Sequence, residues 1–169
     1  MRILGIDPGY ERLGIAVIEK EPRQKPFDSA QGKEQIIFSE CFKTPAVLPF
    51  PERLRLIGEE VKRVIKKYKP EILAIETLFL NTNHKTAMRV AEARGVVIYE
   101  AALAGLQIFE ATPLEVKMAT TGFGRADKPQ IIKMVKMLIE LDEKKCSDDE
   151  LDAIAVGLTA LAKGRYPQF

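Results

Sequence analysis

The chain has almost no excess charge, few cysteines and no long apolar run, and each shortage limits what it can be. Lys and Arg exceed Asp and Glu by only 2 in 169 residues, so a surface for a polyanion would have to be local. The only cysteines, Cys41 and Cys146, lie far apart in no metal-site spacing, which favours free thiols in a reducing compartment. The apolar stretch 96–109 is interrupted by Glu100, so we expect no membrane span. The N-terminus lacks a signal-peptide pattern, and we therefore expect a cytoplasmic protein.

The remaining composition is that of an ordinary globular protein. Hydrophobic residues make up 46% of the chain and charged residues 30%. A chain of 169 residues is long enough for one domain with a full-sized core. No internal repeat or low-complexity segment divides it. We therefore expect residues 1–169 to form a single domain.

Apolar runs and helical spacing predict an alternation of strands and helices after an initial group of strands. Strands are expected at residues 2–7, 12–19, 36–42, 72–76 and 106–109. Helices are expected at residues 53–69, 84–103, 113–120, 129–139 and 147–163. The polar stretch 21–35 predicts a long exposed loop. This order predicts an α/β fold in which one mixed sheet of about five strands is flanked by helices.

Two of the predicted strands end in an acid. Asp7 follows an apolar run and precedes a Pro-Gly turn, and Glu76 ends the strand 72–76 in the same way. A carboxylate is costly to bury without a partner or a metal. If these two strands are parallel neighbours, both acids lie at the same sheet edge, which is the usual ligand edge of such sheets.

The last predicted helix supplies two more acids. Ser147 and Glu150 form a capping box, so acids in the first turn have a structural explanation. Asp152 lies beyond the cap among apolar residues, and Asp149 shares its helix face because the two are three residues apart. The doublet Asp148-Asp149 leaves open which acid is functional, although the three-residue spacing favours Asp149.

Together these four carboxylates favour a site for a hard cation. Oxygen-rich sites suit Mg²⁺ or Mn²⁺. Two such ions would activate a water molecule and stabilise the leaving oxygen of a phosphodiester. Without a metal, clustered acids repel one another and raise each other's pKa values.

Four motifs appear in a fixed order along the whole chain. They are Ile3-Leu4-Gly5-Ile6-Asp7-Pro8-Gly9, Ala74-Ile75-Glu76-Thr77-Leu78-Phe79, Ala93-Arg94-Gly95-Val96 and Asp149-Glu150-Leu151-Asp152-Ala153-Ile154-Ala155. With this ordered set the chain resembles the RuvC family of Holliday-junction resolvases. The resemblance implies a ribonuclease-H-like nuclease domain and a homodimer that makes paired, symmetric nicks in four-way DNA junctions. It also implies a role in recombination and repair, with a branch-migration complex as a partner.

The same resemblance assigns residues to roles. It implies that Asp7, Glu76, Asp149 and Asp152 are the catalytic acids and the ligands of two Mg²⁺ ions, with Mn²⁺ able to substitute. It implies that Phe79 stacks on a base and that Lys117 and Lys128 lie near the scissile strand. Arg125, in a Gly-containing basic loop, is a further candidate for phosphate contact. The helix 84–103 would contribute to the dimer interface, where Gly95 permits close packing.

Three other interpretations stay open at this point. Residues 7–14 also fit the Asp-x-Gly-x-x-x-x-Gly phosphate loop of actin-like and sugar-kinase ATPases, although those folds need a second lobe that this chain lacks. A junction-binding protein without catalysis is disfavoured because clustered acids repel DNA. A ribonuclease-H-like nuclease acting on another branched DNA or on RNA is the nearest rival. On the nuclease interpretation, the Gly-containing turn after Asp7 leaves room for a DNA backbone.

Overall fold

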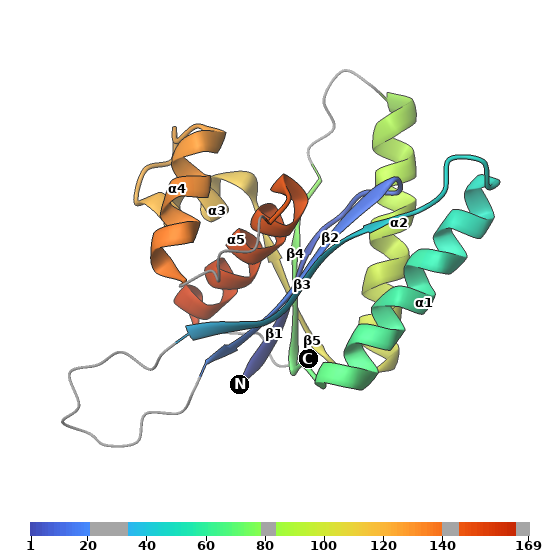
Figure 1. The fold of residues 1–169 in the computed structure, drawn as a ribbon, viewed down its shortest axis with the longest axis horizontal. Helices are drawn as coiled ribbons and strands as arrows, with labels where there is room; N and C mark the ends of the chain where they lie inside the picture. Colours follow the sequence, from blue (N-terminus) through green and yellow to red (C-terminus); the bar gives the residue numbers. More distant parts are fainter. Residues whose placement is uncertain (21–33, 79–83, 140–145, 165–169) are drawn as a thin grey trace.

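The computed structural model, which describes residues 1–20, 34–78, 84–139 and 146–164, places a mixed β-sheet between two layers of helices (Figure 1). The strands are β1 Arg2–Asp7, β2 Arg12–Lys20, β3 Glu34–Lys43, β4 Ile72–Glu76 and β5 Gln107–Ala111. They are ordered β3-β2-β1-β4-β5. The β1 strand is antiparallel to β2 and parallel to β4. The predicted five-stranded mixed sheet flanked by helices is therefore confirmed.

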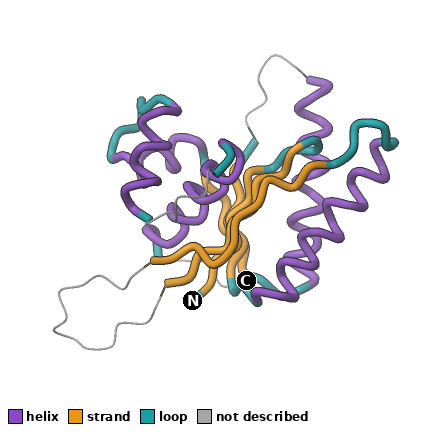
Figure 2. The backbone as a smooth tube through the Cα atoms, in the orientation of Figure 1, coloured by secondary structure: helices purple, strands orange, loops and turns teal. Residues whose placement is uncertain are grey.

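Two helices cover one face of the sheet and three cover the other. Helices α1 Phe50–Tyr68 and α2 His84–Leu103 lie on one side. Helices α3 Pro113–Thr121, α4 Lys128–Leu138 and α5 Asp148–Lys163 lie on the opposite side. Figure 2 shows the strands as a single twisted layer between these groups. No helix among the described residues is both long and apolar enough to cross a bilayer.

Burial on both faces explains why the central strands have nearly continuous apolar sequences. Successive side chains of a strand point to opposite faces of the sheet. In β1, Ile3 packs into the cluster under α5, and Leu4 packs into the cluster under α1 and α2. The same alternation in β4 sends Ile72 and Leu73 to opposite clusters.

Helix α5 lies unusually close to β1 and β2 because glycines face it. A Cβ atom at Gly5 would come within 2.3 Å of the Ala153 carbonyl oxygen. A Cβ atom at Gly14 would come within 2.1 Å of the Asp149 carbonyl oxygen. Real Cβ atoms do not approach a backbone oxygen this closely, so only glycine allows the observed packing. The glycine at position 14 therefore makes room for α5. That the turn after Asp7 admits a DNA backbone stays a prediction.

Several predicted boundaries differ from the structure. The β3 strand begins at Glu34 instead of 36, since its polar first residues still pair with β2, as in the Lys20–Glu34 pair. The predicted loop 21–35 therefore overlaps β3, and the rest of it lies outside the described residues. Helix α1 begins at Phe50 instead of 53 because Pro51 is tolerated in a first helical turn. The β5 strand ends at Ala111, two residues later than predicted.

We predict that Gly14→Ala destabilises the protein. The new methyl group must push α5 away from β2 or distort the backbone, and overpacking of this kind costs about 1–3 kcal/mol. Urea unfolding followed by circular dichroism measures the loss. As a matched control, Gly58→Ala in α1 places its Cβ 3.2 Å from the Val96 Cγ1 atom, a side-chain atom that can move. Equal stability of the two variants would contradict the close packing of α5.

Candidate active site

Two strand ends meet at one edge of the sheet. Asp7 is the last residue of β1 and Glu76 is the last residue of β4. These strands are parallel neighbours, and their pairing runs up to Ile6 opposite Ile75. The two acids follow directly, so both leave the sheet at the same edge, on the side covered by α5. The expected juxtaposition of Asp7 and Glu76 is therefore present.

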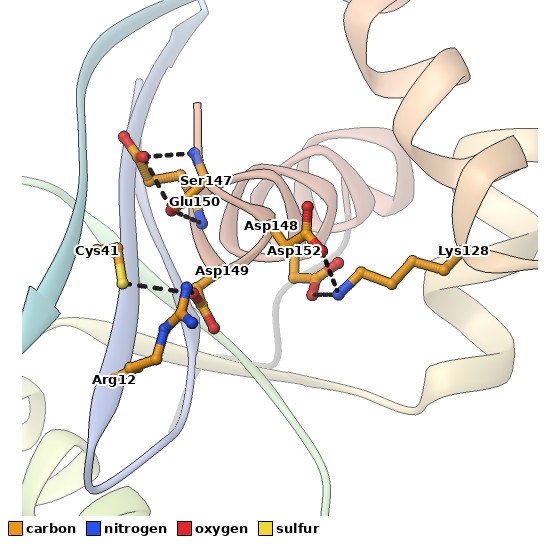
Figure 3. Close-up of polar contacts among 8 residues, drawn as sticks. All are labelled: Arg12, Cys41, Lys128, Ser147, Asp148, Asp149, Glu150 and Asp152. Atoms are coloured by element: carbon orange, nitrogen blue, oxygen red, sulfur yellow. Dashed lines mark hydrogen bonds and ion pairs between the residues drawn. The ribbon is translucent and has the colours of Figure 1, made fainter. Parts of the chain in front are cut away.

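The start of α5 is fixed to the sheet by a buried acid. Glu150 accepts hydrogen bonds from the Ser147 backbone N–H (2.8 Å) and the Ser147 hydroxyl (2.9 Å), which completes the predicted capping box. Its other carboxylate oxygen accepts from the Ser39 hydroxyl of β3 at 2.9 Å. Glu150 thus has a structural role, and it sets the position from which Asp149 and Asp152 project (Figure 3).

Three of the four predicted acids line a single cavity. Asp7, Glu76 and Asp152 border a space of about 220 Å³ together with Lys117 and Lys128. Its apolar lining includes Val116 of α3, Ile131 of α4 and Val156 of α5. The acids come from two strands and one helix that are distant in sequence. Their convergence on one cavity is typical of a binding or catalytic site.

Lys128 is the cationic neighbour of the α5 acids. Its Nζ atom lies 3.0 Å from Asp152 Oδ2 and 3.5 Å from Asp148 Oδ2 (Figure 3). The hydrogen bond to Asp152 raises the pKa of Lys128. Asp148 is exposed and does not line the cavity, so it acts here as a surface partner of Lys128.

Asp149 points away from the cavity toward the β2–β3 side. Its carboxylate forms an ion pair with Arg12 and accepts a hydrogen bond from the Cys41 thiol at 3.3 Å (Figure 3). Asp149 is not among the residues that line the cavity. The structure therefore brings three of the four predicted acids together, and the fourth, Asp149, forms an ion pair with Arg12 instead. Sequence analysis missed Arg12, because an arginine at the start of a strand carries no signal of its partner.

The clustered acids strongly perturb one another. Burial, followed by the negative charges of Asp152, Glu76 and Asp149, raises the pKa of Asp7 to about 7. Burial and the charge of Asp152 also raise the pKa of Glu76, and Lys117 offsets part of that effect. A carboxyl group that is protonated near neutral pH signals a site with uncompensated negative charge, and such sites are frequently functional.

The donor set fits a hard divalent cation. Carboxylate oxygens are the ligands that Mg²⁺ and Mn²⁺ prefer, and burial together with the three neighbouring acids raises the pKa of Asp7. Within the part of the chain that the structure describes, no three acid, His or Cys side chains already form a complete cation cage. A cation bound by all three cavity acids would have to displace Lys128 from Asp152.

Only some of the predicted DNA-contacting residues line the cavity. Lys117 and Lys128 face the cavity, as expected for residues near a reacting phosphate. Arg125 is exposed in the loop before α4 and does not line the cavity. Phe79, the predicted base-stacking residue, lies outside the described residues. The candidate site therefore rests on three acids and two lysines.

Comparisons with known proteins identify one family. A family model, crossover junction endodeoxyribonuclease RuvC, matches residues 3–160. The RuvC protein of Desulfitobacterium hafniense is 45% identical over 159 residues, which is 94% of this chain and 90% of that protein. The RuvC protein of Thermosipho melanesiensis is 42% identical over 166 residues, covering 98% of this chain and 100% of that protein.

Solved structures give the same result. Thermus thermophilus RuvC in complex with a Holliday junction substrate superposes with a TM-score of 0.86 at 30% identity, over 98% of this chain and 95% of that chain. The fowlpox virus Holliday junction resolvase superposes with a TM-score of 0.58 at 13% identity, over 98% of this chain and 100% of that chain, which shows a shared fold alone. The predicted ribonuclease-H-like fold is confirmed.

We predict that the acid cluster makes the metal-free protein less stable as pH rises. Because the pKa of Asp7 is near 7 when folded and near 3.8 when unfolded, its contribution to stability is complete below about pH 4 and is lost as pH rises through 7. The loss is about 4 kcal/mol, at 1.36 kcal/mol per pKa unit. Asp7→Asn should therefore melt at a higher temperature than the wild type at pH 8, and the difference should shrink toward pH 4.

Differential scanning calorimetry in a chelator measures both profiles. Glu52→Gln, on the exposed first turn of α1, is the control: it loses only an exposed ion pair with Arg55, so it should melt no higher than the wild type at pH 8. If Asp7→Asn is no more stable than the wild type at pH 8, then burial and the neighbouring acids do not raise the pKa of Asp7 in the folded protein.

Proposed function

This chain belongs to the RuvC family of crossover junction endodeoxyribonucleases, and we propose that it cuts DNA at the cavity lined by Asp7, Glu76 and Asp152. As a member of that family it is an endonuclease that resolves Holliday junctions. One observation carries the assignment of the site. Three carboxylates from two strand ends and one helix border a single cavity with two lysines, which supplies both metal ligands and phosphate-binding cations.

The family uses a divalent metal, and we propose that this chain binds two Mg²⁺ ions, with Mn²⁺ able to substitute. Bound there, such ions would activate a water molecule and stabilise the leaving oxygen of the phosphodiester. Asp7 and Glu76 would hold them from the strand ends, and Asp152 would join after release from Lys128. We propose Asp149 as the fourth ligand, once its carboxylate turns away from Arg12.

The two cavity lysines are proposed to hold the scissile phosphate. Lys128 forms an ion pair with Asp152 at 3.0 Å. When Asp152 turns to a metal ion, the Lys128 side chain would need to move only a short distance to contact a phosphate oxygen. Lys117 faces the same space from α3. Cations placed where negative charge develops lower the barrier to phosphodiester cleavage. Phe79 as a base-stacking residue and Arg125 as a backbone contact remain proposals on the resemblance alone.

A nucleotide-binding role for the turn after Asp7 is disfavoured by packing. In a phosphate loop, glycines leave backbone N–H groups open to a ligand. Here the space in front of Gly14 is filled by the Asp149 carbonyl group, and a Cβ atom at Gly14 would also lie 3.1 Å from the Asp7 Cβ atom. Non-catalytic junction binding leaves the acid cluster unexplained, because clustered carboxylates weaken DNA binding.

We propose a homodimer that pairs through α2. The outward face of this helix carries Met88, Gly95, Tyr99 and Leu103 at helical spacing, and the three large side chains are 60–66% exposed. A Cβ atom at Gly95 would contact nothing within 4 Å, so the backbone there is open to close approach. Dimer symmetry would supply two sites for two symmetric nicks.

The broader setting is proposed from family membership. We propose that residues 1–169 act as one nuclease domain and that the protein works in the cytoplasm. A branch-migration complex is proposed as its partner on the junction.

A panel of substrates tests the proposed function. We predict that, with Mg²⁺, the protein makes paired nicks in a synthetic mobile four-way junction and leaves a fork, a plain duplex and an RNA–DNA hybrid largely uncut. Denaturing gels of end-labelled strands measure the cuts. Asp7→Asn should lower the rate by about 100- to 1,000-fold or more, since it weakens electrostatic stabilisation of the transition state, while binding the junction as the wild type does. Equal nicking by that variant, or preferential cutting of the hybrid, would refute the proposal.

We also predict that Tyr99→Glu converts a dimer into a monomer. A carboxylate in an apolar interface carries a desolvation cost without a partner. Sedimentation equilibrium at micromolar protein measures the change, and Met137→Glu is the charge-matched control, because Met137 is 69% exposed on α4 in the opposite helix layer. A wild-type protein that is already monomeric, or a dimeric Tyr99→Glu variant, would show that α2 is not the interface.

A further inference from the structure

The backbone of Glu76 is held by an arginine from the opposite side of the sheet. Arg94 lies in the middle of α2, and its side chain is only 17% exposed. Its Nε atom donates a hydrogen bond to the Glu76 backbone carbonyl at 3.0 Å. Its Nη2 atom lies 3.0 Å from Glu110 Oε1 on β5. One guanidinium group therefore bridges the end of β4, β5 and α2.

This contact acts at the point where β4 leaves the sheet. The parallel pairing of β1 and β4 ends at Ile75, one residue before Glu76. On the β5 side the Thr77 N–H donates to the Ala111 carbonyl at 2.8 Å. The Glu76 carbonyl therefore receives its hydrogen bond from a side chain instead of from the neighbouring β1 strand. A backbone carbonyl that loses its partner on burial costs free energy, so Arg94 fixes this peptide group.

Fixing the peptide group also fixes the carboxylate. Glu76 projects its side chain into the cavity on the α5 side, and Arg94 donates a hydrogen bond to its backbone carbonyl from the α2 side. A glutamate side chain has several rotatable bonds, so its carboxylate is placed accurately only if its backbone is held. A misplacement of about 1 Å in such a site can cost about 100-fold in rate.

We propose that Arg94 is a positioning residue that holds Glu76 in place for cation binding through the Glu76 backbone carbonyl. This inference rests on the proposed role of Glu76 as a metal ligand. It also gives α2 a second role, because the helix proposed to pair with a second copy of the chain is joined to the acid cluster by Arg94.

The ion pair with Glu110 does not explain the contact. Glu110 is 49% exposed, and ion pairs with such exposed partners contribute little to stability. A structural ion pair would require only the positive charge of the arginine. Positioning of Glu76 requires instead a donor at the Nε position, four bonds from the Cα atom. These two requirements can be separated by substitution.

Two substitutions of equal length separate the roles. Arg94→Gln places its amide nitrogen at the same number of bonds as Nε, so it keeps a donor for the carbonyl and removes the charge. Arg94→Met has the same reach and no donor. Glu110→Gln removes the ion pair and leaves Arg94 intact. We expect Arg94→Met alone to weaken Mn²⁺ binding by about 10–100-fold, as for other groups that orient metal ligands.

Calorimetric titration of each variant with Mn²⁺ in the absence of DNA gives the decisive readout. Single-turnover cleavage of the four-way junction over a range of Mg²⁺ concentrations should show the same order, with Arg94→Met needing more Mg²⁺ and junction affinity unchanged. Equal behaviour of Arg94→Gln and Arg94→Met, whether both impaired or both normal, overturns the inference. If Arg94→Met does not fold, a loss of Mn²⁺ binding in Arg94→Gln overturns it, and retained binding supports it.

Glu76→Gln separates this inference from the proposed function. If Glu76→Gln neither binds Mn²⁺ normally nor cleaves, while Arg94→Met matches the wild type, only the role of Arg94 is refuted. If Glu76→Gln binds Mn²⁺ and cleaves the junction like the wild type, the proposed site itself is refuted.

Discussion

Helix α5 can bring Asp152 to the end of β1 only where glycines leave no side chains between helix and sheet. Gly5 and Gly14 face the backbone carbonyls of Ala153 and Asp149, and a methyl group at either position would overlap them. This contact sets the depth at which the helix lies on the sheet. The shared cavity of Asp7, Glu76 and Asp152 depends on that depth, because Asp152 lies on α5 while Asp7 and Glu76 end strands of the sheet.

The same closeness concentrates negative charge that the fold must offset. Burial and mutual repulsion raise the pKa of Asp7 to about 7. Lys128 forms an ion pair with Asp152 of α5, and Arg12 forms an ion pair with Asp149 of the same helix. These cations stabilise the cluster, and on the proposed function Lys128 is the group that a cation in the cavity would displace. Repulsion among clustered carboxylates lowers the stability of the metal-free fold, and the same negative charge favours the binding of a divalent ion.

The sequence was sufficient to predict the strand-end acids and the capped helix, because each depends on local pattern. The rules for crossover connections predicted only that β4 is parallel to one of the first three strands, and its place beside β1 was known from the structure alone. Contacts between distant side chains were not predictable. Arg12 meets Asp149 across 137 positions of sequence, and Arg94 reaches a backbone carbonyl that has no sequence signature. The packing role of Gly14 was not predicted, because a glycine in a sequence does not reveal whether a helix or a ligand needs its space. The start of β3 at Glu34 was also missed, because a strand end made of polar residues does not show in the apolar pattern.

The central claim is that the depth of α5 makes the carboxylates of β1, β4 and α5 a single cation site. Crystals soaked in Mn²⁺ and measured at the manganese absorption edge test it directly. We predict anomalous density in the cavity with Asp7, Glu76 and Asp152 as ligands, and with Lys128 moved off Asp152. Anomalous density elsewhere, or a cavity in which Lys128 keeps its ion pair at saturating Mn²⁺, would contradict the account.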